Sequence, residues 1–155
     1  MSNGSGLLLL DTNVLVYAHD RRDWRKQAIA VDLLDRCITA ERAALCAQSL
    51  SEFYVVVTRR LLDRLRPQTA MQQIERLAAA CRVLDMTTPL LLEGCRGSEA
   101  HGISFWDALV WAAAKLAQIP CVLTEDAHHG RSIEGVTFLD PFRREFNAEA
   151  LALRG

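Results

Sequence analysis

The chain has 155 residues, half of them apolar, and a formal net charge of −1 at pH 7. This is the usual size of one globular domain with a substantial core, and a net charge near zero gives no general argument for nucleic-acid binding. The longest apolar run is far shorter than the roughly 20 residues of a membrane-spanning helix, and no basic segment leads into a signal-like core, so we expect a soluble, cytoplasmic protein.

Short apolar strands alternate with helices along the chain. After a flexible tail over residues 1–6, strands are expected at 7–10, 43–47, 81–85, 121–124 and 136–139. Helices are expected at 12–18, 25–39, 49–65, in two segments that begin near Pro67 and Pro89, and at 105–118. This order is typical of a parallel sheet covered on both faces. We therefore predict an α/β three-layer sandwich with a parallel five-stranded sheet.

Four acidic residues are expected at one edge of this sheet. Asp11 directly follows the first strand, and Asp126 comes just after the strand at 121–124. Glu52 in SLSEF and Asp107 in SFWDALVWAAA fall in the predicted first turns of two helices. Because a parallel α/β fold places helix starts at the same edge as strand ends, the four carboxylates should converge in one crevice.

Each acid also has a purely structural interpretation. Asp11 and Asp126 fit helix N-caps, and the other two fit capping boxes in Ser49-x-x-Glu52 and Ser104-x-x-Asp107. Taken together, the pattern favours function, because the apolar stretches after Glu52 and Asp107 predict buried helices. Two negative charges about 4 Å apart repel by roughly 4 kcal/mol at an effective dielectric near 20. A cluster of four therefore needs shared protons or a cation.

The ligand chemistry indicates which cation this would be. Oxygen ligands without paired Cys or His spacing point to Mg²⁺ or Mn²⁺. His128 and His129 follow Asp126 closely, but a histidine pair in a loop is more often exposed than ligating, so neither is assigned to the metal. The cysteines are odd in number and lack C-x-x-C spacing, so we expect buried thiols in a reducing compartment. They are Cys37, Cys46, Cys81, Cys95 and Cys121.

These motifs resemble those of PIN domains and, among them, the small bacterial toxins of the VapC type. The matching segments are D-T-N (11–13), S-E-F (51–53), W-D-A-L (106–109), L-T-E-D (123–126) followed by Gly130, and F-L-D-P-F (138–142). Each motif is short, and the specificity lies in their order and spacing. The resemblance assigns residues 7–142 to the PIN domain and leaves 143–155 as a C-terminal tail. In the fourth motif Asp126 is matched rather than Glu125, because it keeps the T-x-D spacing from Thr124.

The resemblance implies a metal-dependent endoribonuclease that hydrolyses RNA phosphodiester bonds and leaves 5′-phosphate and 3′-hydroxyl ends. Asp11 and Asp107 would hold the principal Mg²⁺ (or Mn²⁺), Glu52 would assist directly or through water, and Asp126 would complete the site or bind a second ion. The metal would lower the pKa of a bound water and neutralise charge on the phosphate oxygens.

Three polar residues are expected to support these acids. Thr12 and Asn13 would orient Asp11 or a water, and Ser104 would do the same for Asp107, although capping alone also accounts for Ser104.

Arginines follow Glu52 along the predicted third helix. Arg59 and Arg60 are candidates to bind RNA phosphates, with a solvated helix face as the alternative. Toxins of this family are usually encoded with an antitoxin that covers the active site, and they often dimerise. The resemblance therefore implies an RNA substrate, a cognate antitoxin and a homodimer, with no membrane partner.

Other α/β protein classes fit less well. A haloacid-dehalogenase phosphatase needs a second aspartate two positions after the first, where this chain has Asn13. A response-regulator receiver needs an acid pair and a late lysine, and neither Lys26 nor Lys115 follows a strand. A PIN fold without catalysis, acting as a nucleic-acid- or protein-binding module, stays open as the alternative function.

Overall fold

The computed structural model describes residues 6–153 of the chain. The predicted N-terminal tail lies almost wholly outside the described residues, as do positions 154 and 155.

A six-stranded sheet with the order β3-β2-β1-β4-β6-β5 forms the middle layer. The strands are β1 (Leu8–Leu10), β2 (Ala43–Cys46), β3 (Arg82–Leu84), β4 (Cys121–Leu123), β5 (Ser132–Ile133) and β6 (Val136–Leu139). The five predicted strands are present and pair in parallel. The predicted number of strands is wrong by one, because β5 pairs antiparallel to β6 through a two-residue turn. Both turn residues, Glu134 and Gly135, have positive φ, as a tight hairpin turn requires.

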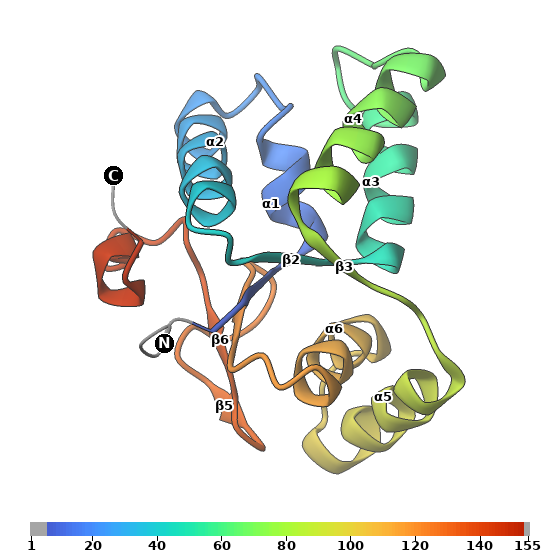
Figure 1. Ribbon diagram of the computed structural model, residues 1–155, viewed down its shortest axis with the longest axis vertical. Coiled ribbons are helices and arrows are strands. Elements are labelled where there is room, and N and C mark those ends of the chain that lie inside the picture. The colour runs from blue at the N-terminus through green and yellow to red at the C-terminus, as the bar shows by residue number, and fades with distance from the viewer. Residues whose placement is uncertain (1–5, 154–155) are drawn as a thin grey trace.

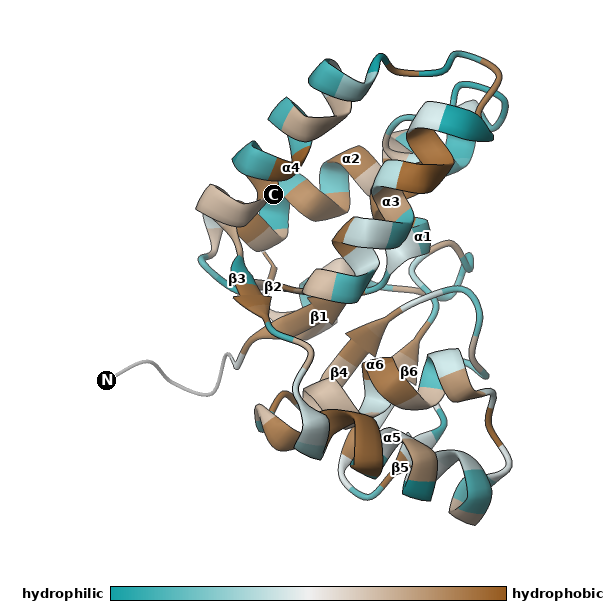
Figure 2. Cartoon of the chain, turned by 90° about the vertical axis from the view of Figure 1, so that its right-hand side faces the viewer, coloured by the Kyte–Doolittle hydropathy of each residue, from teal (hydrophilic) through white to brown (hydrophobic). Residues whose placement is uncertain are grey.

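Six α-helices cover the two faces of the sheet. They are α1 (Thr12–Tyr17), α2 (Trp24–Thr39), α3 (Ala47–Arg59), α4 (Pro67–Ala80), α5 (Thr88–His101) and α6 (Phe105–Leu116). Figures 1 and 2 show α1 to α4 on one side of the sheet and α5 with α6 on the other. The strands between these layers are strongly hydrophobic in Figure 2. None of the helices in the described part of the chain has the length and apolar character to span a bilayer.

The apolar run before Asp11 is explained by burial on both sides of the sheet. Leu8 and Leu10 belong to the core beneath α1 to α4, whereas Leu9 belongs to the core beneath α5 and α6. Successive side chains of a strand point to opposite faces, so a strand covered on both faces must be apolar throughout.

The third helix begins and ends earlier than predicted. It starts at Ala47, immediately after β2, and its N-cap Cys46 makes no side-chain capping bond. Ser49 is therefore buried inside the helix and is no capping residue. The prediction that Glu52 lies in the first turn is wrong, since Glu52 lies in the second turn.

The described part of the predicted C-terminal tail packs against the domain. A 3₁₀ helix, η1 (Ala148–Leu151), leads to Leu153, whose side chain is fully buried in the core beneath α1 to α4. The buried Arg42 guanidinium donates hydrogen bonds to the carbonyls of Gly6 and Leu151. This arginine thus joins the two ends of the described chain at the edge opposite Asp11.

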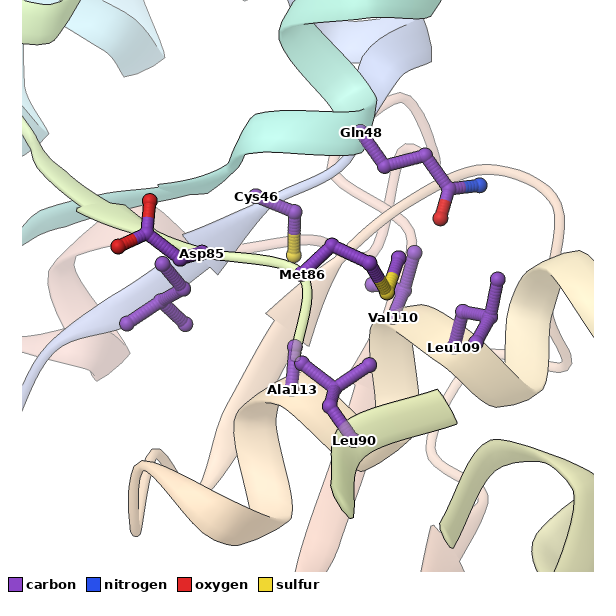
Figure 3. A pocket seen from close by; sticks show the side chains of 9 residues that line it. Cys46, Gln48, Asp85, Met86, Leu90, Leu109, Val110 and Ala113 are labelled. Carbon is purple, nitrogen blue, oxygen red and sulfur yellow. The ribbon is translucent and has the colours of Figure 1, made fainter. Parts of the chain in front are cut away.

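The seam between the sheet and the α5–α6 layer contains a small apolar cavity of about 10 Å³. Figure 3 shows Cys46, Met86 and Val110 around it. Space of this size corresponds to one water molecule at most, and the apolar lining offers too few polar partners to hold it. Burial raises the pKa of the Cys46 thiol to about 12, with the negative charges of Asp11 and Glu52 adding to the effect. All five cysteines are free, and the prediction that they are buried is wrong for Cys81, which is half-buried, and for Cys95, which is exposed.

Candidate metal centre

Three of the four predicted acids meet at the carboxyl edge of the sheet. Asp11 follows β1, Asp126 lies in the loop after β4, and Asp107 lies in the first turn of α6. One carboxylate oxygen from each residue lies within 4.8 Å of the others. The convergence expected from parallel α/β topology therefore occurs for these three residues.

Asp11 is the most deeply placed of the three, with 8% of its surface exposed. Its Oδ1 accepts a hydrogen bond from the Thr12 backbone N–H at 2.8 Å, and its Oδ2 accepts one from the Thr124 hydroxyl at 2.9 Å. Burial raises the pKa of Asp11 to about 6, and the negative charges of Asp126 and Glu52 contribute while the two hydrogen bonds oppose the shift. Asp11 is also the N-cap of α1, so its structural interpretation holds alongside its place in the cluster.

Asp126 is positioned by Asn13 and Thr124. Asn13 Nδ2 donates to Asp126 Oδ2 at 3.1 Å and to Thr124 Oγ1 at 2.9 Å. The Asp126 backbone N–H donates to the same Thr124 hydroxyl at 3.2 Å. Desolvation raises the pKa of Asp126, with further contributions from neighbouring carboxylates. No helix follows Asp126 directly, so the N-cap interpretation does not apply to it.

The Asp107 carboxylate has no hydrogen-bond donor among residues 6–153. Its backbone N–H donates to Ser104 Oγ at 3.1 Å, which makes Ser104 the N-cap of α6. The reciprocal half of a capping box, from the acid side chain to the Ser104 N–H, is not formed between these described residues. Capping thus explains Ser104 but leaves the Asp107 carboxylate available for a ligand.

Glu52 lies at the rim of the acid cluster. Its Oε2 accepts from the Thr12 hydroxyl at 3.2 Å, and its Oε1 accepts from Gln48 Nε2 at 2.9 Å. Glu52 is not one of the three carboxylates whose oxygens lie within 4.8 Å of one another. Thr12 therefore connects Glu52 to Asp11, through its hydroxyl on one side and its backbone N–H on the other.

Glu125 points away from the cluster. It accepts hydrogen bonds from Lys26 Nζ at 2.7 Å and from the Tyr17 hydroxyl at 2.6 Å. Of the two adjacent acids, Asp126 is the one whose carboxylate lies close to those of Asp11 and Asp107.

The remaining candidates lie outside the cluster. Arg60 is exposed and lines a groove that also contains Glu52, whereas Arg59 is exposed and does not line that groove. His128 lines a neighbouring pocket with Asp107 and Asp126, and His129 Nδ1 accepts the Asp140 backbone N–H. Thr124 was not among the predicted site residues, although its hydroxyl contacts Asp11, Asn13 and Asp126 and the T-x-D spacing places it two positions before Asp126.

The donor set fits a hard divalent cation. All three converging groups are carboxylates, and within the described chain no Lys or Arg side chain forms an ion pair with any of them. Mg²⁺ binds oxygen at roughly 2.1 Å, which places neighbouring ligand atoms about 3–4 Å apart. The three carboxylate oxygens lie within 4.8 Å of one another, and bound positive charge would offset their mutual repulsion.

Comparison with known proteins assigns most of the chain to a known family. The PIN domain model matches residues 8–132, and no curated protein matches the chain. The fold is similar to a toxin–antitoxin complex from Klebsiella pneumoniae, with 15% identity, a TM-score of 0.60 and coverage of 86% of this chain and 97% of that one. It is similar to VapC20 of Mycobacterium tuberculosis, described as a sarcin–ricin loop cleaving toxin, with 20% identity, a TM-score of 0.58 and coverage of 74% and 86%.

A third structure, DNA-bound VapBC from Salmonella typhimurium, has 16% identity, a TM-score of 0.61 and coverage of 88% and 98%. At these identities the structural likeness shows the fold alone. The family-model match runs from β1 to the first residue of β5 and includes all four predicted acids, and on this ground the chain belongs to the PIN domain family.

Proposed function

We propose that this chain is a metal-dependent endoribonuclease of the VapC type, in which Asp11, Asp107 and Asp126 hold Mg²⁺ or Mn²⁺. The observation that carries the proposal is the meeting of three carboxylates from three separate parts of the chain, one of them buried. A hard cation bound there would lower the pKa of a bound water and neutralise charge on the phosphate oxygens. Hydrolysis would leave 5′-phosphate and 3′-hydroxyl ends.

The chain's own residues would organise the reaction. Thr12, Asn13 and Thr124 fix the carboxylates of Asp11 and Asp126 before substrate arrives, which avoids the free-energy cost of ordering them later. Glu52, held by Gln48 and Thr12, would assist from the rim, either directly or through a water.

The same resemblance supports a biological role as the toxin of a type II toxin–antitoxin pair. The fold is shared with chains solved in VapBC and other toxin–antitoxin complexes, which supports a protein antitoxin as partner. A homodimer is proposed from the family resemblance alone.

The alternative is a PIN fold that binds nucleic acid or protein without cutting. The three converging carboxylates favour the nuclease, because their uncompensated negative charge would repel a nucleic-acid backbone unless a cation were bound between them.

The test is cleavage of a panel of structured and single-stranded RNAs in Mg²⁺, Mn²⁺ or EDTA. The native chain is compared with Asp11→Asn and Asp107→Asn, and Glu125→Gln serves as the control because this neighbouring acid is paired with Lys26. We expect cutting that EDTA and both aspartate substitutions abolish and that Glu125→Gln preserves. Cutting that persists in both aspartate variants would contradict the proposed site. No cutting, together with no stabilisation by divalent cations, would favour the binding module.

A further inference from the structure

A groove of about 600 Å³ runs along α3 beside the metal centre. Glu52 lies within it, and Trp106, the residue before Asp107, lines it from the start of α6. The groove is therefore adjacent to the point where a phosphodiester would be cut. Its volume lies in the range of sites that enclose small organic groups.

Trp106 presents an aromatic surface that the fold itself does not use. The side chain is 63% exposed, although tryptophan is highly buried on average. It packs edge-to-face against Phe105, with ring centroids 5.4 Å apart and an interplanar angle of 65°. Phe105 is partly buried against the α5–α6 core, so it braces the Trp106 ring from one side. Trp111 five residues later is instead fully buried, with its Nε1 bonded to the Ile133 carbonyl.

The other groove residues suit a flat, anionic ligand. Val55 and Val56 on α3 supply apolar surface, and Val55 is 39% exposed. Arg60, the C-cap residue of α3, contributes a positive charge that forms no ion pair within residues 6–153. An aromatic plane beside a cationic group is the arrangement by which proteins hold single-stranded nucleic acids, with bases stacked on the ring and phosphates near the charge.

We propose that this groove binds an unpaired nucleobase of the RNA substrate, stacked on Trp106 with a neighbouring phosphate near Arg60. The proposal rests on the proposed nuclease function and specifies its substrate class: the cut falls beside an unstacked base, in a single-stranded or looped segment. Bases stacked within an A-form duplex do not offer a free face to a protein side chain, so duplex RNA is excluded from the groove.

Tryptophan fluorescence tests this without relying on cleavage. In the Asp11→Asn background with Mg²⁺, short single-stranded RNAs are titrated against the protein, together with abasic ribose-phosphate chains and duplexes of the same length. Stacking on Trp106 should quench its emission, and the quenching should persist in Trp24→Phe, which alters another exposed tryptophan, but vanish in Trp106→Phe.

Affinity measured by an independent method separates stacking from apolar contact. Trp106→Leu keeps apolar volume but removes the aromatic plane, and we expect it to weaken single-strand binding by about 5- to 150-fold. Trp106→Phe should restore most of this loss. Melting temperatures close to that of the parent protein would show that these changes at an exposed position leave folding intact.

Several results would overturn the nucleobase site. These are unchanged RNA affinity and cleavage in Trp106→Leu, equal quenching by the abasic chain, or equal binding of the duplex. Loss of only a protein partner's binding in Trp106→Leu would assign the groove to that partner and also overturn it. If RNA quenches Trp106 but the native chain cleaves no RNA, the nucleobase site stands and the nuclease function fails.

Discussion

The Thr124 hydroxyl donates a 2.9 Å hydrogen bond to Oδ2 of Asp11, although 113 positions separate the two residues. The same buried hydroxyl accepts hydrogen bonds from Asn13 Nδ2 and from the Asp126 backbone N–H. Since β1 and β4 pair with Leu10 opposite Leu123, the register of the sheet sets the distance between Asp11 and Asp126. The carboxylates are thus brought together by the fold itself, and their repulsion opposes folding when no cation is bound.

Burial of Asp11, together with this weaker repulsion, predicts how stability without metal depends on pH. Burial raises the folded-state pKa of Asp11 to about 6 from an ordinary value of 3.8. An acid whose pKa is raised on folding holds its proton more tightly in the folded state, so its stabilising effect is complete below about pH 4 and is lost as pH rises through 6. Between these two pH limits, the contribution of Asp11 to the free energy of unfolding falls by ~3 kcal/mol.

We therefore expect Asp11→Asn to unfold less readily than the native chain at pH 7.5 in EDTA, and to lose this advantage near pH 4. Denaturant unfolding at both pH values measures the effect. Equal pH dependence of the two proteins between pH 4 and 6 would contradict the raised pKa. Mg²⁺ at pH 7.5 should reverse the ranking, because only the native chain gains stability from binding.

The neighbouring acids Glu125 and Asp126 should differ in metal binding. Asp126 converges with Asp11 and Asp107, whereas Glu125 is paired with Lys26 and Tyr17. We expect Asp126→Asn to reduce the Mg²⁺-dependent rise in melting temperature and Glu125→Gln to preserve it. An equal loss of the Mg²⁺-dependent rise in both variants would show that Glu125 contributes to metal binding as much as Asp126 does.

The sequence was sufficient to locate Asp11 and Asp107, because each depends on a local rule. An apolar strand ended at Asp11, and Ser104 marked the start of a helix at the correct spacing from Asp107. The position of Glu52 could not be read in this way. Helix α3 starts directly from β2 without a side-chain cap, and Ser49, which matches a capping residue, is buried inside the helix.

Features that depend on long-range contacts or on very short elements also could not be predicted from local sequence patterns. The role of Thr124 depends on the pairing of β1 with β4, which brings together residues more than 100 positions apart. Strand β5 has two residues, too few for a periodic pattern, and its place is set by the turn at Glu134 and Gly135. The C-terminal segment around the buried Leu153 is likewise held by two distant arginines, since Arg42 donates to the Leu151 carbonyl and Arg36 to the Leu153 carbonyl.

Two adjacent arginines offer a matched test of RNA contact. Arg60 lines the groove beside Glu52, whereas Arg59 does not. We expect Arg60→Ala to weaken RNA binding and to reduce the slope of log affinity against log salt by about 0.7, the value for one phosphate contact to a single strand. Arg59→Ala should have the smaller effect. Unchanged affinity and salt slope in the double Ala variant would remove both residues from the RNA site.

The packing of α5 on α6 depends on Gly97. A Cβ atom built at this position would lie 2.2 Å from Cζ3 and 2.6 Å from Cε3 of Trp111. The Trp111 ring is fully buried and its Nε1 is bonded to the Ile133 carbonyl, so it has no free space into which to move. We expect Gly97→Ala to destabilise the protein by about 1–3 kcal/mol or more in denaturant unfolding, despite the higher helix propensity of alanine.

Gly94, one turn earlier on α5, provides the control for this substitution. A Cβ atom there would lie 2.7 Å from Cδ2 of Leu109, the far end of a flexible side chain, so the overlap is smaller than at Gly97 and involves fewer atoms. Gly94→Ala should therefore be close to neutral, because the gain in helix propensity of roughly 1 kcal/mol offsets a small rearrangement. Since α6 also carries Asp107, Gly97→Ala should weaken the Mg²⁺-dependent stabilisation more than Gly94→Ala does. Equal stability of the two variants would mean that the Trp111 ring can move to make room for the added methyl group. Equal Mg²⁺-dependent stabilisation would mean that the α5–α6 contact does not fix the start of α6.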